Sequence, residues 1–64
     1  MNIRVELPGE GHRELDIEGT YADVLRAVDL SPQEASVLVD GRPVPADRPI
    51  DATEVTVLRL IAGG

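Results

Sequence analysis

Few side chains in this sequence are of the types that perform chemistry. The 64 residues include no cysteine and no lysine, which excludes a thiol nucleophile, a disulfide and a Schiff base. The single histidine, His12, could be combined with Ser31 or Ser36 and an aspartate into a hydrolytic triad, but nothing in the sequence builds a pocket around it. As a metal ligand, His12 has no second histidine or cysteine to act with it. We therefore expect no enzyme, no metal site and no bound cofactor, and instead a carrier, a substrate or a subunit.

Charge narrows the classes of partner. Twelve acidic residues stand against six arginines, the net charge is -6, and Tyr21 is the only aromatic residue. Such a chain repels phosphate backbones and offers no stacking platform, so we expect no direct nucleic-acid binding. No apolar run reaches about 18 residues and the N-terminus has no signal-peptide pattern, so we expect a cytoplasmic protein without membrane contact. Arginine as the only basic residue, on an acidic chain, favours a halophilic, high-salt cytoplasm.

Hydrophobic periodicity indicates the elements of the first half. Alternating apolar residues predict strands over 2–7 and 12–18, joined by a turn. Thr20 and Asp23 match a capping box, which predicts that a helix begins there. The helix is expected to end near 29–30, with its core-facing residues at helical spacing: Tyr21, Val24, Leu25 and Val28.

The second half reads as strands and turns. Asp40 and Gly41 form a hairpin signal, and Pro43 restricts the strand after it to a short edge strand. The predicted order is turn, strand, edge strand, loop and long final strand, at residues 31–34, 36–40, 42–44, 45–51 and 54–61.

This order predicts an α+β domain of the β-grasp, ubiquitin-like class. The first and last strands are apolar enough to be central and parallel, with one main helix crossing a mixed sheet of four to five strands. The domain is expected over 1–61, followed by a flexible tail at 62–64.

The sequence resembles the ubiquitin-like small archaeal modifier proteins of haloarchaeal type, within the group of ubiquitin-like modifiers and sulfur carriers. Residues 37–44 (VLVDGRPV) are similar to the strand and turn of that family, and residues 54–64 (EVTVLRLIAGG) to its last strand and diglycine tail. Residues 19–28 (GTYADVLRAV) are similar to its helix. The sequence departs from the family at 52–55 (ATEV), where relatives often have Gly-Asp-Glu-Val.

The resemblance implies that Gly63 and Gly64 are the reactive end. In this family an ATP-dependent activating enzyme forms a transient adenylate on the terminal carboxylate. The carboxylate is then conjugated to target lysines through an isopeptide bond, or becomes a thiocarboxylate for tRNA thiolation. Glycines suit this role because a backbone without Cβ atoms can enter a narrow channel. We expect that no protease is needed to expose Gly64, and that a chain without lysine forms single-unit conjugates.

A docking surface is expected next to this tail. If Val55 and Val57 face the core, Leu38, Leu58 and Leu60 share the opposite face and could bind the activating enzyme. Arg59 could pair with an acidic partner surface. The alternatives are that the loop at 45–50 covers these leucines and that Arg59 is merely solvated.

Two further functions remain open. One is a dedicated sulfur carrier, either the small subunit of molybdopterin synthase, bound to its large subunit, or the carrier of the thiazole pathway. The other is a β-grasp interaction module without tail chemistry, in which the two glycines are only a frayed end.

Overall fold

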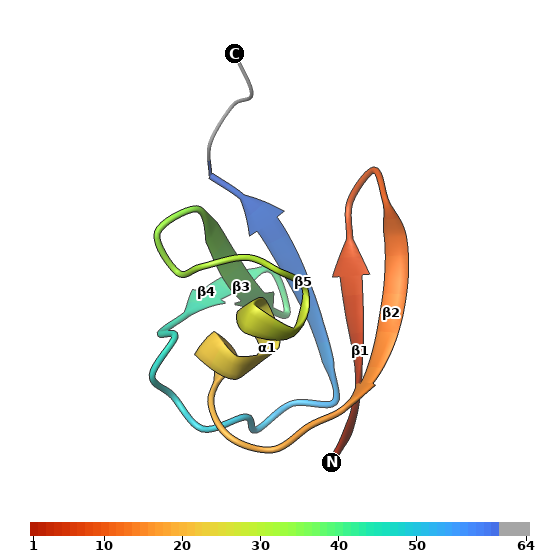
Figure 1. Cartoon of the computed structure of the whole chain (residues 1–64), viewed down its shortest axis with the longest axis vertical. Coiled ribbons are helices and arrows are strands. Elements are labelled where there is room, and N and C mark those ends of the chain that lie inside the picture. The colour runs from red at the N-terminus through yellow and green to blue at the C-terminus, as the bar shows by residue number, and fades with distance from the viewer. Residues whose placement is uncertain (61–64) are drawn as a thin grey trace.

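The first two strands form a hairpin at one edge of the sheet. In the computed structural model, which describes residues 1–60, β1 (Asn2–Leu7) pairs antiparallel with β2 (Gly11–Asp16) (Figure 1). The second strand ends before the predicted residue 18, because β1 offers it no partner beyond Met1. The Met1 carbonyl accepts the last bond of the ladder, from the N–H of Ile17 at 2.8 Å.

The helix α1 (Tyr21–Ala27) begins at the predicted capping box. The Thr20 N–H donates to Asp23 Oδ2 at 2.9 Å, which is the side-chain bond of Asp23 in the capping box. The Asp23 N–H also donates to the Thr20 carbonyl at 3.0 Å and closes the first turn. Gly19, just before the cap, has a φ of 123°, and a Cβ atom there would lie 2.2 Å from Asp23 Oδ2. Glycine is therefore the residue that this helix start requires.

The helix ends two to three residues earlier than predicted. Asp29 adopts a left-handed φ of 61°, which no helix can continue. The N–H groups of Asp29 and Leu30 then donate back to the carbonyls of Arg26 and Leu25, at 3.1 and 2.9 Å. This pair of bonds is a Schellman cap, with Asp29 in the position that glycine usually takes.

The second hairpin joins β3 (Ala35–Val39) to β4 (Arg42–Val44), which confirms the short edge strand. Asp40 and Gly41 both have positive φ, 54° and 79°, as a two-residue turn between antiparallel strands requires.

The last strand, β5 (Glu54–Arg59), lies in the middle of the sheet. It runs parallel to β1 and antiparallel to β3, and the strand order is β2-β1-β5-β3-β4. One helix on one face of a mixed five-stranded sheet, within residues 1–60, confirms the α+β β-grasp prediction (Figure 1). The predicted strand ran to residue 61, whereas β5 ends at Arg59 and Ile61 lies outside the described residues.

The core lies between α1 and the sheet. Val55 and Val57 are each 2% exposed, as predicted for the helix-facing side of the last strand. The other buried members come from β1, α1 and β3, namely Ile3, Val5, Tyr21, Val24, Leu25, Ala35 and Val37. In the described part of the chain, no helix has the length and apolarity needed to cross a bilayer.

Candidate functional site

The candidate site is the end of β5, from which the chain continues toward Gly63 and Gly64. Both glycines and the predicted tail at 62–64 lie outside the described residues, so the reactive end remains a prediction. The structure describes the platform that precedes this end: the outer face of the sheet, which is the face away from α1, and the residues around Arg59.

An apolar patch lies on the outer face beside β5. Val57 and its partner Val37 point into the core, so the next residue on each strand, Leu58 or Leu38, points outward. Leu58 lies opposite Ser36 and Leu38 opposite Thr56, which makes the two leucines diagonal neighbours. Pro43 pairs with Leu38 from β4 and is exposed.

We call Leu38, Pro43 and Leu58 the leucine patch. Leu58 is 39% exposed and Leu38 is half-buried. Pro43 was missed as a member of this surface in the sequence analysis, where it served only to mark an edge strand. The two-residue turn at Asp40 and Gly41 fixes which residues face each other across β3 and β4, so the hairpin register would have identified it.

The loop that could have covered the leucines instead packs against the start of the helix. The N–H groups of Tyr21 and Ala22 donate to the carbonyls of Arg48 and Ala46, at 3.1 and 2.8 Å. The Ile50 N–H donates to the Gly19 carbonyl at 2.9 Å. The loop is therefore held to the helix side, and Leu58 stays exposed on the outer face.

Arg59 lies on the opposite side of β5 from Leu58. It pairs with Ala35 and follows the inward alternation of Val55 and Val57, at the point where the sheet ends. Its Nη2 lies 3.7 Å from Glu10 Oε2 in the turn between β1 and β2. A hollow of about 240 Å³ lies at this ion pair, lined by Leu7, Pro8, Glu10, Leu30, Val57, Leu58 and Arg59.

Leu60 is the last residue that the structure describes. It follows the end of β5, and its N–H donates to the Glu34 carbonyl at 2.9 Å. It lines a hollow of about 120 Å³ together with residues on the core side, including Leu25, Val37 and Val44. At 62% exposure it is the most exposed large apolar residue of the described chain. The predicted place of Leu60 beside Leu38 and Leu58 stays a prediction, because β5 ends at Arg59.

The hydroxyl of Tyr21 binds the loop between β4 and β5 to the start of α1, a contact that the sequence did not predict. The fully buried Tyr21 donates from its hydroxyl to Asp51 Oδ1, and the Asp51 N–H donates back to the hydroxyl oxygen at 3.2 Å. Burial, reinforced by the hydrogen bond to Asp51, raises the pKa of the Tyr21 phenol above its usual value. A tyrosine buried at a helix start is a signal that its hydroxyl needs a partner, although the sequence does not say which one.

The residues of the imagined triad lie apart. His12 is exposed on β2, whereas Ser36 is on β3, with β1 and β5 between the two strands. Three strand spacings amount to about 14 Å, too far for a proton relay. Ser31 lies in the turn before β3, where its N–H donates to Glu34 Oε1 at 3.1 Å.

Comparison with known proteins gives a consistent result. A family model described as small archaeal modifier protein 2 matches residues 1–61. The curated protein of that name from Haloferax volcanii is 59% identical over 66 residues, which cover 100% of both chains. An uncharacterized protein from Archaeoglobus fulgidus is 30% identical over 67 residues, again with 100% of both chains covered. The crystal structure of the H. volcanii small archaeal modifier protein 2 matches with a TM-score of 0.69 and 58% identity, covering 97% of each chain.

Proposed function

The chain belongs to the small archaeal modifier protein 2 family, and on this premise we propose that it is a ubiquitin-like modifier and sulfur carrier that is activated at Gly64. The observation that carries the proposal is the pair Gly63-Gly64, which follows β5 in a chain that matches the family model over residues 1–61. The chain contributes a carboxylate and a docking surface, and a partner enzyme contributes the catalysis.

Activation makes an unreactive carboxylate electrophilic. On an activating enzyme, an oxygen of the Gly64 carboxylate attacks the α-phosphorus of ATP, and pyrophosphate leaves. The resulting mixed anhydride has AMP as its leaving group. A lysine amine that attacks the carbonyl carbon, directly or after transfer to an enzyme thiol, expels the leaving group and forms an isopeptide bond.

Sulfur transfer uses the same adenylate. An enzyme persulfide attacks the carbonyl carbon and displaces AMP, which gives an acyl disulfide. A second thiol then reduces this bond, so that the enzyme is left as a disulfide and Gly64 as a thiocarboxylate. This species is a sulfide donor, and we propose tRNA thiolation as its use, through an enzyme that binds the tRNA.

The leucine patch is the surface that we assign to the activating enzyme. Leu58 lies two residues before Leu60 on the strand that leads to the tail, so a protein that holds the patch also holds the base of the tail. Leu60 adds a second apolar contact at the end of β5, and Arg59 adds a positive charge beside it. These three residues surround the end of β5 rather than forming one flat face.

The proposal is tested by pyrophosphate exchange. The chain is incubated with its activating enzyme, ATP and labelled pyrophosphate, and the label that returns to ATP is measured. We expect exchange with the full chain and none after deletion of Gly64. Exchange that persists without Gly64 would overturn the activation chemistry. Thiocarboxylate without any lysine adduct in cells would favour a dedicated sulfur carrier over a modifier.

A further inference from the structure

The sheet has two edges, and they differ in what they offer to a further strand. The strand order β2-β1-β5-β3-β4 places β2 and β4 at the edges. An edge strand carries one row of N–H and C=O groups that its own sheet does not use, and another chain can pair with them. β2 is six residues long and β4 is three.

The register shows which groups of β2 face outward. The Ile17 N–H donates to the Met1 carbonyl at 2.8 Å, so Met1 and Ile17 form a hydrogen-bonded pair. Hydrogen-bonded and non-hydrogen-bonded pairs alternate along an antiparallel ladder. Leu15 and Arg13 are therefore bonded to β1 as well. The residues between them turn their N–H and C=O groups to the open edge, and these are His12, Glu14 and Asp16.

The same reasoning shows that β4 is closed. The two-residue turn at Asp40 and Gly41 makes Val39 and Arg42 a hydrogen-bonded pair. The next residue, Pro43, is then the one that faces the open edge, and proline has no N–H to donate. The only residue of β4 that could offer an outward donor is thus unable to do so, whereas β2 offers three.

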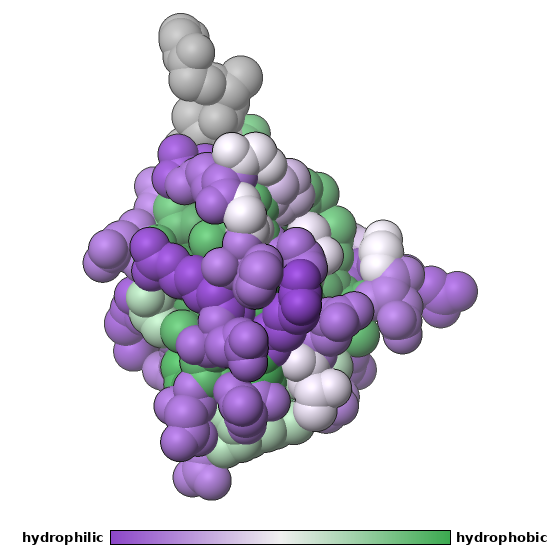
Figure 2. Space-filling view, turned by 90° about the vertical axis from the view of Figure 1, so that its right-hand side faces the viewer, coloured by the Kyte–Doolittle hydropathy of each residue, from purple (hydrophilic) through white to green (hydrophobic). Residues whose placement is uncertain are grey.

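Side chains on β2 define the chemistry of a fitting strand. On the outer face, Glu14 forms no ion pair among residues 1–60, because the opposing Arg4 is bound to Glu6 at 2.9 Å. Asp16 adds a second carboxylate, 91% exposed and 3.3 Å from the Met1 amine. Figure 2 looks onto this edge and shows hydrophilic side chains over most of it. On the inner face, half-buried Leu15 packs against the core and could extend it to an apolar neighbour.

We infer that β2 is a recognition edge to which a partner protein adds an extended segment of alternating basic and apolar residues. The basic side chains lie beside Glu14 and Asp16, and the apolar ones lie beside Leu15. A second copy of this chain fits poorly, because antiparallel pairing of two β2 strands centred on this position sets Glu14 against Glu14. In the sheet, β1 separates β2 from β5, so the edge and the leucine patch can be occupied at the same time (Figure 1).

Amide exchange and chemical shifts of the full-length chain test this inference. The probe is an eight-residue peptide of alternating lysine and valine, and its control is the same peptide with every backbone nitrogen methylated, which has equal charge and no N–H donor to pair with β2. We expect the lysine-valine peptide to slow the exchange of the His12, Glu14 and Asp16 amides and to shift their signals. An absence of slowing at these amides, or the same response with the methylated peptide, would overturn the inference.

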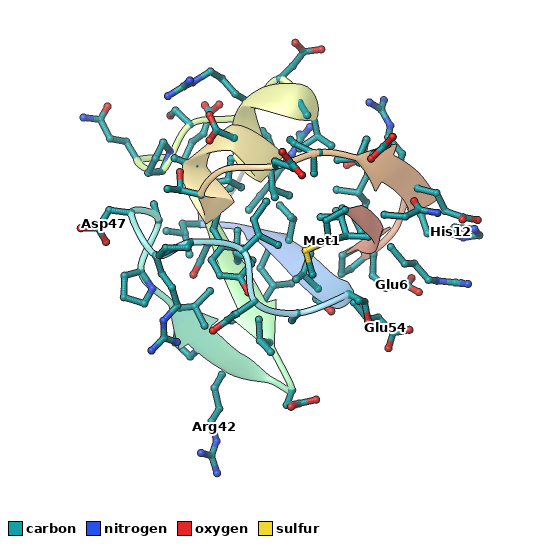
Figure 3. The ribbon with its side chains drawn as sticks, turned by 90° about the horizontal axis from the view of Figure 1, so that it is seen from below. Met1, Glu6, His12, Arg42, Asp47 and Glu54 are labelled. Carbon is teal, nitrogen blue, oxygen red and sulfur yellow. The ribbon has the colours of Figure 1, made fainter. Side chains whose placement is uncertain are left out.

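Two variants with the same net charge distinguish specific binding to β2 from non-specific electrostatic attraction. Glu14→Lys and Asp47→Lys both change the net charge from -6 to -4, by the same two units. Asp47 is exposed in the loop on the opposite side of the molecule from His12 (Figure 3). We expect Glu14→Lys to weaken peptide binding about tenfold, through one lost attraction and one new repulsion, and Asp47→Lys to weaken it less than about threefold.

Equal losses in the two variants would show non-specific attraction and would refute the recognition edge. Proton NMR spectra of both variants check that the fold is retained. The experiment contains no activating enzyme and no ATP, so its failure leaves the chemistry at Gly64 untouched, and the failure of pyrophosphate exchange leaves the recognition edge untouched.

Discussion

The two sides of the sheet's outer face have different chemistry. On the side of β3, β4 and β5, the face carries the leucine patch and its edge is closed by Pro43. On the side of β1 and β2, the face carries charged pairs such as Arg4 and Glu6, and the edge is open. The difference suggests a division of labour within 60 residues. The apolar side lies along the strand that leads to the tail, and the charged side lies away from it, where it can be recognised without contact to the tail.

The largest expected effect is on the rate of pyrophosphate exchange, and it comes from a substitution on the apolar side. Leu58→Asp places a charge in the leucine patch and should slow pyrophosphate exchange roughly thirtyfold, as expected for the loss of a binding hot spot. Because Leu58 is 39% exposed, the fold should tolerate the change. Glu14→Lys on the charged side is the control and should change the exchange rate by less than about twofold. Similar rates of pyrophosphate exchange for the two variants would contradict the division of labour between the two sides.

The second effect concerns the segment between β2 and α1, through which the chain leaves the charged side of the sheet. Gly19→Ala brings a Cβ atom to 2.2 Å from Asp23 Oδ2 at a φ of 123°, so it should disrupt the capping box. We expect a loss of about 2–3 kcal/mol in the free energy of unfolding, measured with urea. Gly9→Ala is the control: its φ is 84°, but nothing lies within 4 Å of the added atom. Its cost should be limited to the backbone strain, about 1 kcal/mol.

A third, smaller effect concerns the loop between β4 and β5, which packs against the start of α1. Tyr21→Phe removes the bonds between the hydroxyl and Asp51 and should cost about 1 kcal/mol of unfolding free energy. The raised pKa of Tyr21 adds a pH dependence with a definite sign. The folded state holds the phenol proton more tightly than the unfolded state. This contribution is therefore complete below about pH 10 and declines as pH rises through the folded-state pKa.

Urea unfolding of both proteins from neutral to strongly alkaline pH measures this dependence. The parent chain should lose stability in the alkaline range, and the Phe variant should lose less. Parallel profiles for the two proteins would show that Tyr21 does not supply the alkaline slope.

The smallest effect on stability lies at the junction of the two sides. Arg59 and Glu10 are both well exposed and 3.7 Å apart, so Arg59→Gln or Glu10→Gln should change the unfolding free energy by less than about 0.5 kcal/mol. Their effects on activation should differ. Arg59→Gln should slow pyrophosphate exchange severalfold at low salt and less at high salt. Glu10→Gln frees the arginine and should not slow it. A loss with both variants would mean that the ion pair itself is needed.

Much of this fold can be predicted from local sequence patterns. The capping box at Thr20 and Asp23, the turn at Asp40 and Gly41, and the inward pair Val55 and Val57 were all predicted, because each depends on residues close in the chain. The ends of the elements were predicted less well. The helix ends early because Asp29 adopts a left-handed conformation, which for a residue other than glycine depends on the surrounding structure.

The candidate site was predicted in part for the same reason. Leu38 and Leu58 follow from strand alternation, and they do share the outer face. Leu60 lies beyond the last residue of β5, so its face stays a prediction. The contacts of Tyr21 with Asp51 and of Arg59 with Glu10 join residues that are distant in the chain, so only the folded chain reveals them. The open edge of β2 likewise depends on the strand order.

The most direct test of the central claim is proteomic, in the organism that encodes the chain. An N-terminally tagged form is expressed, and tryptic digests are searched for lysines that carry Leu60-Ile61-Ala62-Gly63-Gly64, the segment that follows Arg59 in the sequence. Activation at Gly64 predicts this remnant on several proteins and its loss when Gly64 is deleted. A digest with no remnant on any lysine, together with a terminus that never exchanges oxygen for sulfur, would contradict the proposed function.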